Sequence, residues 1–350
     1  MNRIHNLDYL RGLSAFGIMF YHFMSWTFVK FNSSHFLGKF GLYGVAIFYV
    51  LSGLTLYHVY NNRLRFNVES ISDFFKKRFF RIIPLLFLAT ILGLAITLKA
   101  PDYPKLILNI TGLSGLFDWS NYYATGAWSI GNELVFYLFI PVFVFLNLKS
   151  KISLCIFSLF VFSIFIHFAF YGYTEGKDLL DKSQWHIYVN PLNQLFLFLS
   201  GFLIGVFFSE MKINNWILVA ILISSFCIFT FYPASGPTIN LVKDYNRILY
   251  SFLCILICFS FYKITFEIPK NFHKIFCFLG EVSFSVYLLH PIIYTVSNQL
   301  IKIFEKKFFS LNIYIKIPLL ITETLIFSYL VYTFYEKAFM KLAKSSKKKF

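Results

Sequence analysis

The chain has 350 residues, of which 58% are hydrophobic and only 14% are charged, and its mean hydropathy is +0.66. Globular chains are about 45–50% apolar and about 25% charged, so a soluble enzyme, a disordered protein and a nucleic-acid-binding domain are excluded. The net charge of +16 comes from basic residues in short clusters between apolar runs, which is typical of loops beside anionic lipid headgroups. The sequence therefore predicts an all-α, polytopic membrane protein.

Ten apolar segments predict ten transmembrane helices, since a helix needs about 20 residues to cross a bilayer. An even number of spans places both termini on one side, and 20 of the 32 lysines and arginines then lie inside if the orientation is N-in and C-in. Lysines in the 302–316 loop are the exception. We expect one membrane domain over 1–350, with a helical bundle at 1–336 and a basic cytoplasmic tail at 337–350. The ten segments are 12–29, 40–62, 82–98, 134–148, 152–174, 183–209, 213–242, 248–262, 282–301 and 317–335.

The first segment places two polar side chains on one helix face. Arg11 lies at its inner end, and His22 lies slightly past its middle. The 11-residue spacing is three turns plus about 20°, so both side chains point the same way, about 16 Å apart along the axis. Ionisable groups inside a membrane usually face the bundle interior, which favours a polar track. A snorkelling arginine with a histidine hydrogen-bonded for packing is the alternative.

The second and third segments carry two further features. Ser52 and Gly53 lie inside the second segment, where close helix packing is the ordinary explanation. Arg78 and Arg81 are about one turn apart where the chain enters the third segment, and we expect Pro84 near the helix start, where its missing N–H costs least. The two guanidinium groups suit a phosphate clamp, although positive-inside anchoring explains them too.

The fourth segment follows the sequence GAWSIGNELVFY. Ser129 and Glu133 are four residues apart there and share a helix face. We expect them at the outer mouth of the span, where a glutamate near the positive end of the helix dipole is also a structural cap. A polar cluster and a simple cap are therefore both compatible with this stretch.

The ninth segment contains His290 near its middle, followed by Pro291. A proline inside a span frees a backbone carbonyl and kinks the helix. A structural kink beside a buried histidine therefore competes with a functional site. In the tenth segment, Glu323 is the only acid deep in a predicted span, and its partner is not evident from the sequence.

The remaining residues predict neither a metal nor a resident cofactor. The five cysteines form no CxxC pair, and the chain has no HExxH, P-loop or dinucleotide-binding motif. His5 and His273 fall in predicted loops or helix ends and carry no signal. Gly201 and Gly205 form a small-xxx-small pair that is typical of close helix packing.

Five motifs in chain order resemble those of the acyltransferase-3 family of bacterial integral-membrane acyltransferases. They are LDYLRGLSAFGIMFYH, which holds Arg11 and His22, then FYVLSGL, RFFRIIP, WSIGNELVFY and SFSVYLLHP, and they cover nearly the whole chain. Phe284, Tyr49 and Leu54 depart from residues common in the family. None of these three departures removes a chemical group that is expected to act in catalysis.

The resemblance implies transfer of an acyl group, usually acetyl, from cytoplasmic acyl-CoA to a hydroxyl. The acceptor would be a sugar of a cell-surface glycan (O-antigen, capsule or exopolysaccharide) or of its lipid-linked precursor, and the enzyme would lie in the bacterial cytoplasmic membrane. The expected partners are acyl-CoA, the carbohydrate and the lipid bilayer. Acyl-CoA is a substrate in this interpretation, and no metal, resident cofactor or nucleic acid is expected.

A hydroxyl is a poor nucleophile and needs a base near its proton. A histidine that is neutral near pH 7 suits that task, and we assign it to His22. Direct attack on the thioester and a transient acyl-histidine both remain open. Arg11 would bind the donor or stabilise the thioester oxyanion, while Glu133 and Ser129 would orient the imidazole or bind the acceptor.

Supporting roles fall to the other polar residues. Arg78 and Arg81 would bind the anionic nucleotide end of acyl-CoA, whose pantetheine arm is long enough to reach the bundle centre. Trp128 at the mouth would offer a flat face to a sugar ring. His290 would be a second polar group across the cavity, and Ser52 a supporting residue.

Two other functions remain compatible with the sequence. Ten helices with buried His22, His290 and Glu323 would suit a proton-coupled transporter, although the chain has no internal repeat and no matched pair of interrupted helices. An acyltransferase that modifies a peptide, a lipid or another non-carbohydrate acceptor is the second alternative.

Overall fold

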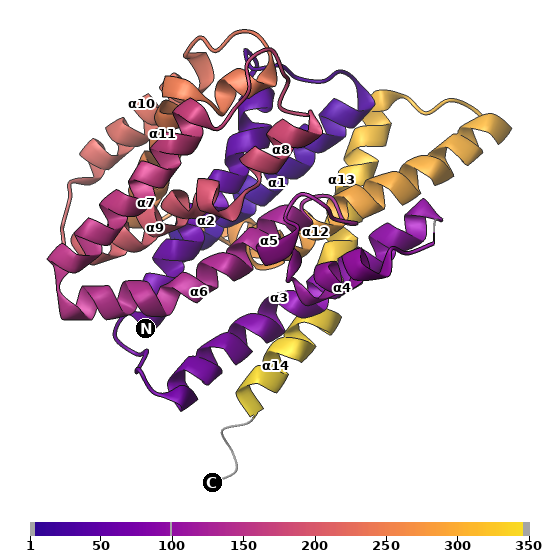
Figure 1. Cartoon of the computed structure of the whole chain (residues 1–350). Helices are drawn as coiled ribbons and strands as arrows, with labels where there is room; N and C mark the ends of the chain where they lie inside the picture. The colour runs from indigo at the N-terminus through magenta and orange to yellow at the C-terminus, as the bar shows by residue number, and fades with distance from the viewer. Residues whose placement is uncertain (1–3, 99, 346–350) are drawn as a thin grey trace.

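The structure, a computed structural model, describes residues 4–98 and 100–345, and these form a bundle of helices (Figure 1). No strand occurs within the described residues. The predicted all-α class is therefore confirmed. The elements are α1 (His5–Thr27), α2 (Phe36–Tyr60), α3 (Val68–Thr97), α4 (Tyr103–Thr111), α5 (Ser114–Phe117), α6 (Ala127–Lys149), α7 (Lys151–Tyr171), α8 (Lys182–Tyr188), α9 (Pro191–Phe208), α10 (Asn215–Phe231), η1 (Thr238–Leu241), α11 (Asp244–Lys263), α12 (Lys270–Lys307), α13 (Ile313–Leu330), η2 (Val331–Glu336) and α14 (Lys337–Ser345).

Each predicted apolar segment contains a helix, although the segment 213–242 is helical only in part, as α10 and η1, and the segment 183–209 is divided between α8 and α9. Within the described residues, eight helices are long and apolar enough to cross a membrane: α2, α3, α6, α7, α8 with α9, α11, α12, and α13 with its continuation. The 23-residue α1 and the 17-residue α10 account for the other two segments. A multi-pass membrane protein is thereby confirmed, while the count of ten spans stays a prediction.

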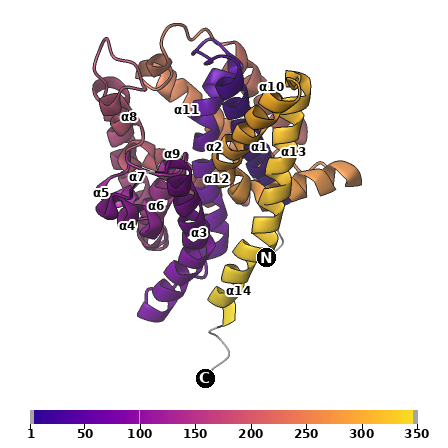
Figure 2. The same cartoon turned by 90° about the vertical axis from the view of Figure 1, so that its right-hand side faces the viewer.

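The beginning of α1 and the end of α14 lie at the same end of the bundle, which we call the terminal end (Figures 1 and 2). The connections from α1 to α2 and from α12 to α13 lie at the opposite end. Residues 337–345 of the predicted tail are helical and pack beside α3, whereas 346–350 lie outside the described residues. The tail is therefore not a simple extension, because α14 borders the bundle.

Helix α3 begins earlier than the apolar pattern indicated. Asn67 caps it, with its side-chain oxygen accepting from the Ser70 N–H at 2.9 Å. The charged first turns project beyond the bundle (Figure 2). Pro84 consequently lies deep inside α3 rather than near its start, so our expectation for this proline was wrong. The error arose because the polar residues that precede the apolar span are also helical.

Helices α2 and α9 make the closest crossing in the centre of the bundle. A Cβ atom added at Gly53 would overlap the carbonyl oxygen of Phe198, and one added at Gly201 would overlap that of Val50. Gly205 packs against a tyrosine ring of α2 in the same way. Small residues thus let the two backbones touch, as expected from the sequence, and they hold α2 rigidly behind the site.

Two cations that the sequence placed in outer loops are buried. Arg247 is 1% exposed and donates to the Asn193 carbonyl at 3.2 Å and to Gln194 Oε1 at 2.9 Å. Lys39 is also 1% exposed, and its Nζ donates to the carbonyls of Thr230 and Tyr232 at 2.9 and 2.8 Å. Neutral oxygens therefore bind both cations, although the buried Nε of Arg247 has no hydrogen-bond partner among the described residues.

Two acidic side chains near the end of the chain differ in their hydrogen bonding. Glu323 Oε2 is buried and has no hydrogen-bond partner among the described residues. Glu336, at the end of the π-helical segment η2, is 5% exposed and accepts a hydrogen bond from the Ser285 hydroxyl. Glu336 therefore joins the chain end to α12.

Candidate active site

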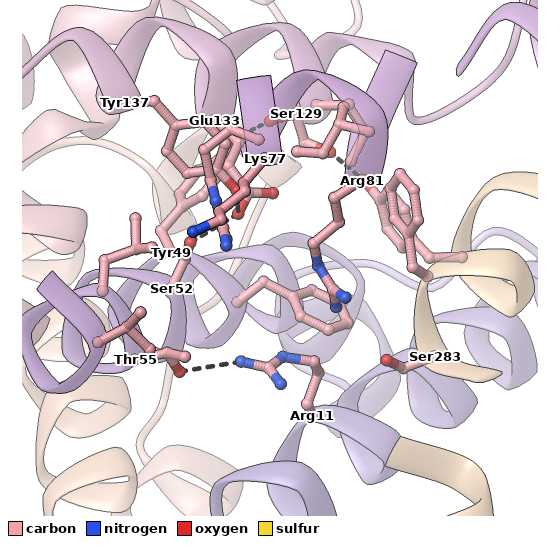
Figure 3. A pocket seen from close by; sticks show the side chains of 18 of the residues that line it. Arg11, Tyr49, Ser52, Thr55, Lys77, Arg81, Ser129, Glu133, Tyr137 and Ser283 are labelled. Atoms are coloured by element: carbon pink, nitrogen blue, oxygen red, sulfur yellow. Dashed lines mark hydrogen bonds between the residues drawn. The ribbon is translucent and has the colours of Figure 1, made fainter. Parts of the chain in front are cut away.

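A pocket of about 370 Å³ lies between α1, α2, α3, α6, α12 and α14, on the side of the terminal end. Figure 3 shows its side chains converging on one space. It collects predicted site residues from four separate motifs, which makes it the natural candidate for the active site. Its charged and hydroxyl-bearing lining residues are Arg11, Ser52, Thr55, Lys77, Arg78, Arg81, Ser129, Glu133, Tyr137, Ser283 and the two tyrosines Tyr49 and Tyr287.

Arg78 and Arg81 bring positive charge to the pocket from consecutive turns of α3. The Arg78 guanidinium lies over the rings of Tyr60 and Tyr137 at 5.5 and 5.8 Å, and its Nε is buried without a hydrogen-bond partner among the described residues. Arg81 approaches the Met340 sulfur at 3.9 Å. Within residues 4–98 and 100–345, no carboxylate pairs with either arginine. Both arginines are half-buried, and a partly desolvated cation without a counterion favours an anionic ligand.

Arg11 reaches the same space from α1. It forms an ion pair with Asp8 at 3.2 Å and donates to Thr55 Oγ1 at 3.1 Å, the bond drawn dashed in Figure 3. Lys77, in contrast to the two arginines of α3, is held by Asp73 at 2.6 Å. The anchors on Arg11 fix its guanidinium beside the cavity, where it supplements the charge of α3.

Among the residues that the structure describes, Glu133 is the only acid that lines the pocket. Its Oε1 accepts hydrogen bonds from Ser52 Oγ and from the Tyr137 hydroxyl, both at 2.6 Å. Bonds to a carboxylate are roughly twice as strong as neutral ones, so Ser52 and Tyr137 hold this side chain firmly. The predicted supporting role of Ser52 thus has a geometric basis, although no observation tests catalysis.

Ser129 lies one turn before Glu133, but it joins a different network. Its hydroxyl contacts the Tyr287 hydroxyl at 2.7 Å and donates to the Gly126 carbonyl at 2.8 Å. Gly126 is the N-cap residue of α6 and has a positive φ of 87°. The first residues of the helix are buried. Glu133 and Ser129 therefore face the pocket that holds the arginines, and their expected position at an outer mouth stays a prediction.

His22 and His290 form a stacked pair outside the pocket lining. Their ring centroids are 5.2 Å apart at 28°, and His22 also stacks on Trp26 at 4.7 Å. His290 Nδ1 lies 3.0 Å from the Val286 carbonyl and must donate to it, because a carbonyl only accepts. Its buried Nε2 has no partner among the described residues. Tyr287 borders both places, since it lines the pocket and its ring centroid lies 6.3 Å from that of His290.

Trp128 does not occupy the position predicted for it. Its side chain is only 8% exposed, lies 5.7 Å from both the Trp185 and Tyr188 rings, and is not part of the pocket lining. The exposed indole near the histidines is instead that of Trp26, which is 40% exposed. Trp128 is thus a packing residue, and Trp26 takes its place as the accessible flat surface.

Sequence reasoning missed Tyr137 and Tyr287. Tyr137 follows Glu133 by four residues, and Tyr287 precedes His290 by three. Both spacings put the tyrosine on the same helix face as the residue already identified, Glu133 or His290. The helical periodicity therefore pointed to both tyrosines. Thr55 gave no comparable signal, because its bond to Arg11 joins two helices.

A membrane-embedded helical bundle with a cationic pocket and a neighbouring histidine pair suits a membrane acyltransferase. A comparison with known families supports this class: the model of the acyltransferase-3 family (Acyl_transf_3, described as an acyltransferase domain) matches residues 4–334. The chain therefore belongs to the acyltransferase-3 family. No curated protein and no solved structure matches it. The family assignment removes the transporter alternative.

Proposed function

We propose that this membrane acyltransferase takes an acyl group, most simply acetyl, from acyl-CoA and delivers it to a hydroxyl of a cell-surface carbohydrate or its lipid-linked precursor. The observation that carries the proposal is the presence of Arg78 and Arg81, without counterions among the described residues, in the same pocket as Arg11 and Glu133. In the orientation we propose, N-in and C-in across the bacterial cytoplasmic membrane, the pocket meets cytoplasmic acyl-CoA.

The donor would lie with its phosphates against the arginines of α3. Guanidinium groups bind phosphate oxygens through paired N–H donors, and half-buried arginines without counterions would be stabilised by such a ligand. The pantetheine arm would then follow α1, along which Arg11 and His22 are separated by about 16 Å. This places the thioester near the bundle centre while the nucleotide stays at the terminal end.

His22 would act as the base. It takes the proton of the acceptor hydroxyl as the oxygen forms a bond to the thioester carbon; the carbon–sulfur bond then breaks, and the CoA thiolate leaves and gains a proton. The half-buried position of His22, stacked on the ring of His290, would keep its imidazole in place. A transient acyl-histidine is the alternative route, with the same residues and the same net reaction.

The acceptor would approach His22 from the side of Trp26. Trp26 is exposed and stacks on His22, and Tyr294 lies 5.0 Å from the Trp26 ring. Flat aromatic faces with polar edges suit a sugar ring, which has an apolar face and a hydroxylated rim. Donor and acceptor would therefore reach the histidine from opposite ends of the bundle.

The donor assignment is tested by binding of CoA to the purified full-length protein. We expect Arg78→Ala with Arg81→Ala to weaken CoA binding at least tenfold, since each charge-assisted hydrogen bond contributes about 1.5–3 kcal/mol. Binding of pantetheine, which lacks phosphates, should change little. Arg65→Ala removes an exposed arginine before α3 and serves as the matched control. Equal CoA affinity in the double variant and the wild type would contradict the clamp.

The catalytic assignment is tested by mass spectrometry of surface glycans from cells that express wild type or His22→Ala at equal levels. General-base catalysis contributes about 10²–10⁴-fold, so we expect acylation to fall to background in the variant. His167→Ala, on α7 away from the site, is the control histidine. Undiminished acylation in His22→Ala would remove His22 from the mechanism.

A further inference from the structure

Three metal-ligating side chains lie together where α1 and α12 begin, outside the pocket. His5 is the first residue of α1, and His273 and Cys277 share one face of α12 because they are four residues apart. Their ligand atoms all lie within 4.8 Å of one another, and all three side chains are half-buried. We propose that His5, His273 and Cys277 bind a divalent transition metal ion of the zinc type.

The distances between these atoms fit tetrahedral coordination. Cys277 Sγ lies 3.6 Å from His5 Nδ1 and 3.7 Å from His273 Nε2. Bonds of about 2.3 Å from zinc to sulfur and about 2.0–2.1 Å from zinc to nitrogen place sulfur and nitrogen about 3.6 Å apart in a tetrahedron. Both sulfur–nitrogen distances therefore match those of a tetrahedral site.

Tyr9 contacts one ring nitrogen of His273. Its hydroxyl lies 2.5 Å from His273 Nδ1, and the two rings meet edge to face with centroids 5.9 Å apart. Metal-bound histidines usually donate their other ring N–H to an oxygen, which fixes the tautomer and the ring orientation. In the tautomer that donates Nδ1–H to Tyr9, Nε2 would keep its lone pair for the metal; Nε2 and Nδ1 lie 3.7 and 3.9 Å from Cys277 Sγ.

The donor set selects the class of metal. Two imidazoles and a thiolate suit zinc and exclude magnesium and calcium, which prefer oxygen ligands. Three protein ligands leave a fourth position for a water molecule. The bound ion would join the start of α1, which carries Arg11, to α12, which carries Ser283 and Tyr287 of the pocket. The inference is independent of acyl transfer.

The test is cobalt(II) titration of the full-length protein, purified through a tag without histidines and followed by absorption spectroscopy. We expect about one equivalent of cobalt to bind with a thiolate-to-cobalt charge-transfer band and the intense visible bands of tetrahedral cobalt, and zinc to displace it. Cys277→Ser should abolish the charge-transfer band. Cys155→Ser, on the exposed face of α7, is the matched control and should titrate like the wild type.

A milder variant guards against a folding defect. Tyr9→Phe keeps all three ligands and removes only the hydroxyl that orients His273, and we expect it to weaken metal binding about 10–100-fold. Zinc should also raise the thermal unfolding midpoint of the wild type and leave that of Cys277→Ser unchanged. The proposal is overturned if the monodisperse wild type shows no charge-transfer band, or if Cys277→Ser binds cobalt as tightly as the wild type does.

Discussion

Trp26 and Trp128 show how the surroundings of an indole ring separate a binding role from a packing role. Trp128 is 8% exposed between two other aromatic rings, whereas Trp26 is 40% exposed and stacked on His22. Truncation of Trp128 removes buried apolar area. Truncation of Trp26 removes a surface that is available to a ligand.

Substitution of the two tryptophans should therefore have opposite consequences. We expect Trp128→Ala to cost about 3–5 kcal/mol of folding stability, the usual result for a buried tryptophan, and to lower the unfolding midpoint in detergent. Trp26→Ala should leave that midpoint nearly unchanged and raise the KM for the acceptor while the donor KM stays constant. A higher acceptor KM in a stably folded Trp128 variant, with none for Trp26, would reverse the assignment.

The sequence identified several charged residues of the pocket, but it did not identify the side chains that they contact. Arg11, Arg78, Arg81 and Glu133 were singled out because they lie at the ends of apolar runs within the five motifs, and all four line the pocket. The contact of Ser52 with Glu133 could not be predicted, because the two residues lie on different helices and are 81 positions apart in the sequence. Side-chain partners across helices depend on rotation and crossing angle, which composition does not encode.

Among the helices, the α2–α9 crossing depends on the absence of side chains. The backbone carbonyl of Val50 lies where a Cβ of residue 201 would be. Because the obstacle is backbone rather than a flexible side chain, it cannot move away without shifting α2. Overpacking of this kind typically costs about 1–3 kcal/mol.

We therefore expect Gly201→Ala to lower the thermal unfolding midpoint of the detergent-purified protein, measured by size-exclusion chromatography after heating. Ser200→Ala, one residue earlier on α9, removes a hydroxyl that bonds only its own helix at 2.7 Å and is the matched control. It should unfold like the wild type. An equal midpoint for both variants would mean that the crossing tolerates a methyl group.

The limits of the helices were less predictable than their existence. Apolar runs identified every segment, but α3 and α12 extend beyond them into charged sequence at Val68 and Lys270. A charged turn is helical when it continues a helix that packing has already nucleated. Pattern reasoning stops where hydrophobicity stops, and for this reason it misplaced Pro84 and treated α14 as a tail.

For the whole molecule, labelling of cysteines at the two ends of the bundle measures its orientation in the membrane. We expect Lys177→Cys, in the loop between α7 and α8, to react with a membrane-impermeant maleimide on intact cells. Arg63→Cys, between α2 and α3, should react only after the membrane is permeabilised. Both positions are exposed, and the parent chain gives the background from native cysteines. The reverse pattern would place the pocket outside, away from cytoplasmic CoA.

Composition and charge were sufficient to predict the class, because no soluble fold can bury so much apolar surface. The family followed from the order of five motifs. The His5, His273 and Cys277 cluster was beyond reach, since each residue is unremarkable in its own segment. Only the close pairing of α1 with α12 brings the cluster together.

Tyr287 borders both the pocket and the ring of His290, and its hydroxyl is hydrogen-bonded to Ser129. In the reaction that we propose, a thioester would be lost to hydrolysis whenever water reached it before the acceptor did. The packing of this one ring would then influence how many acyl groups are delivered for each CoA that is released.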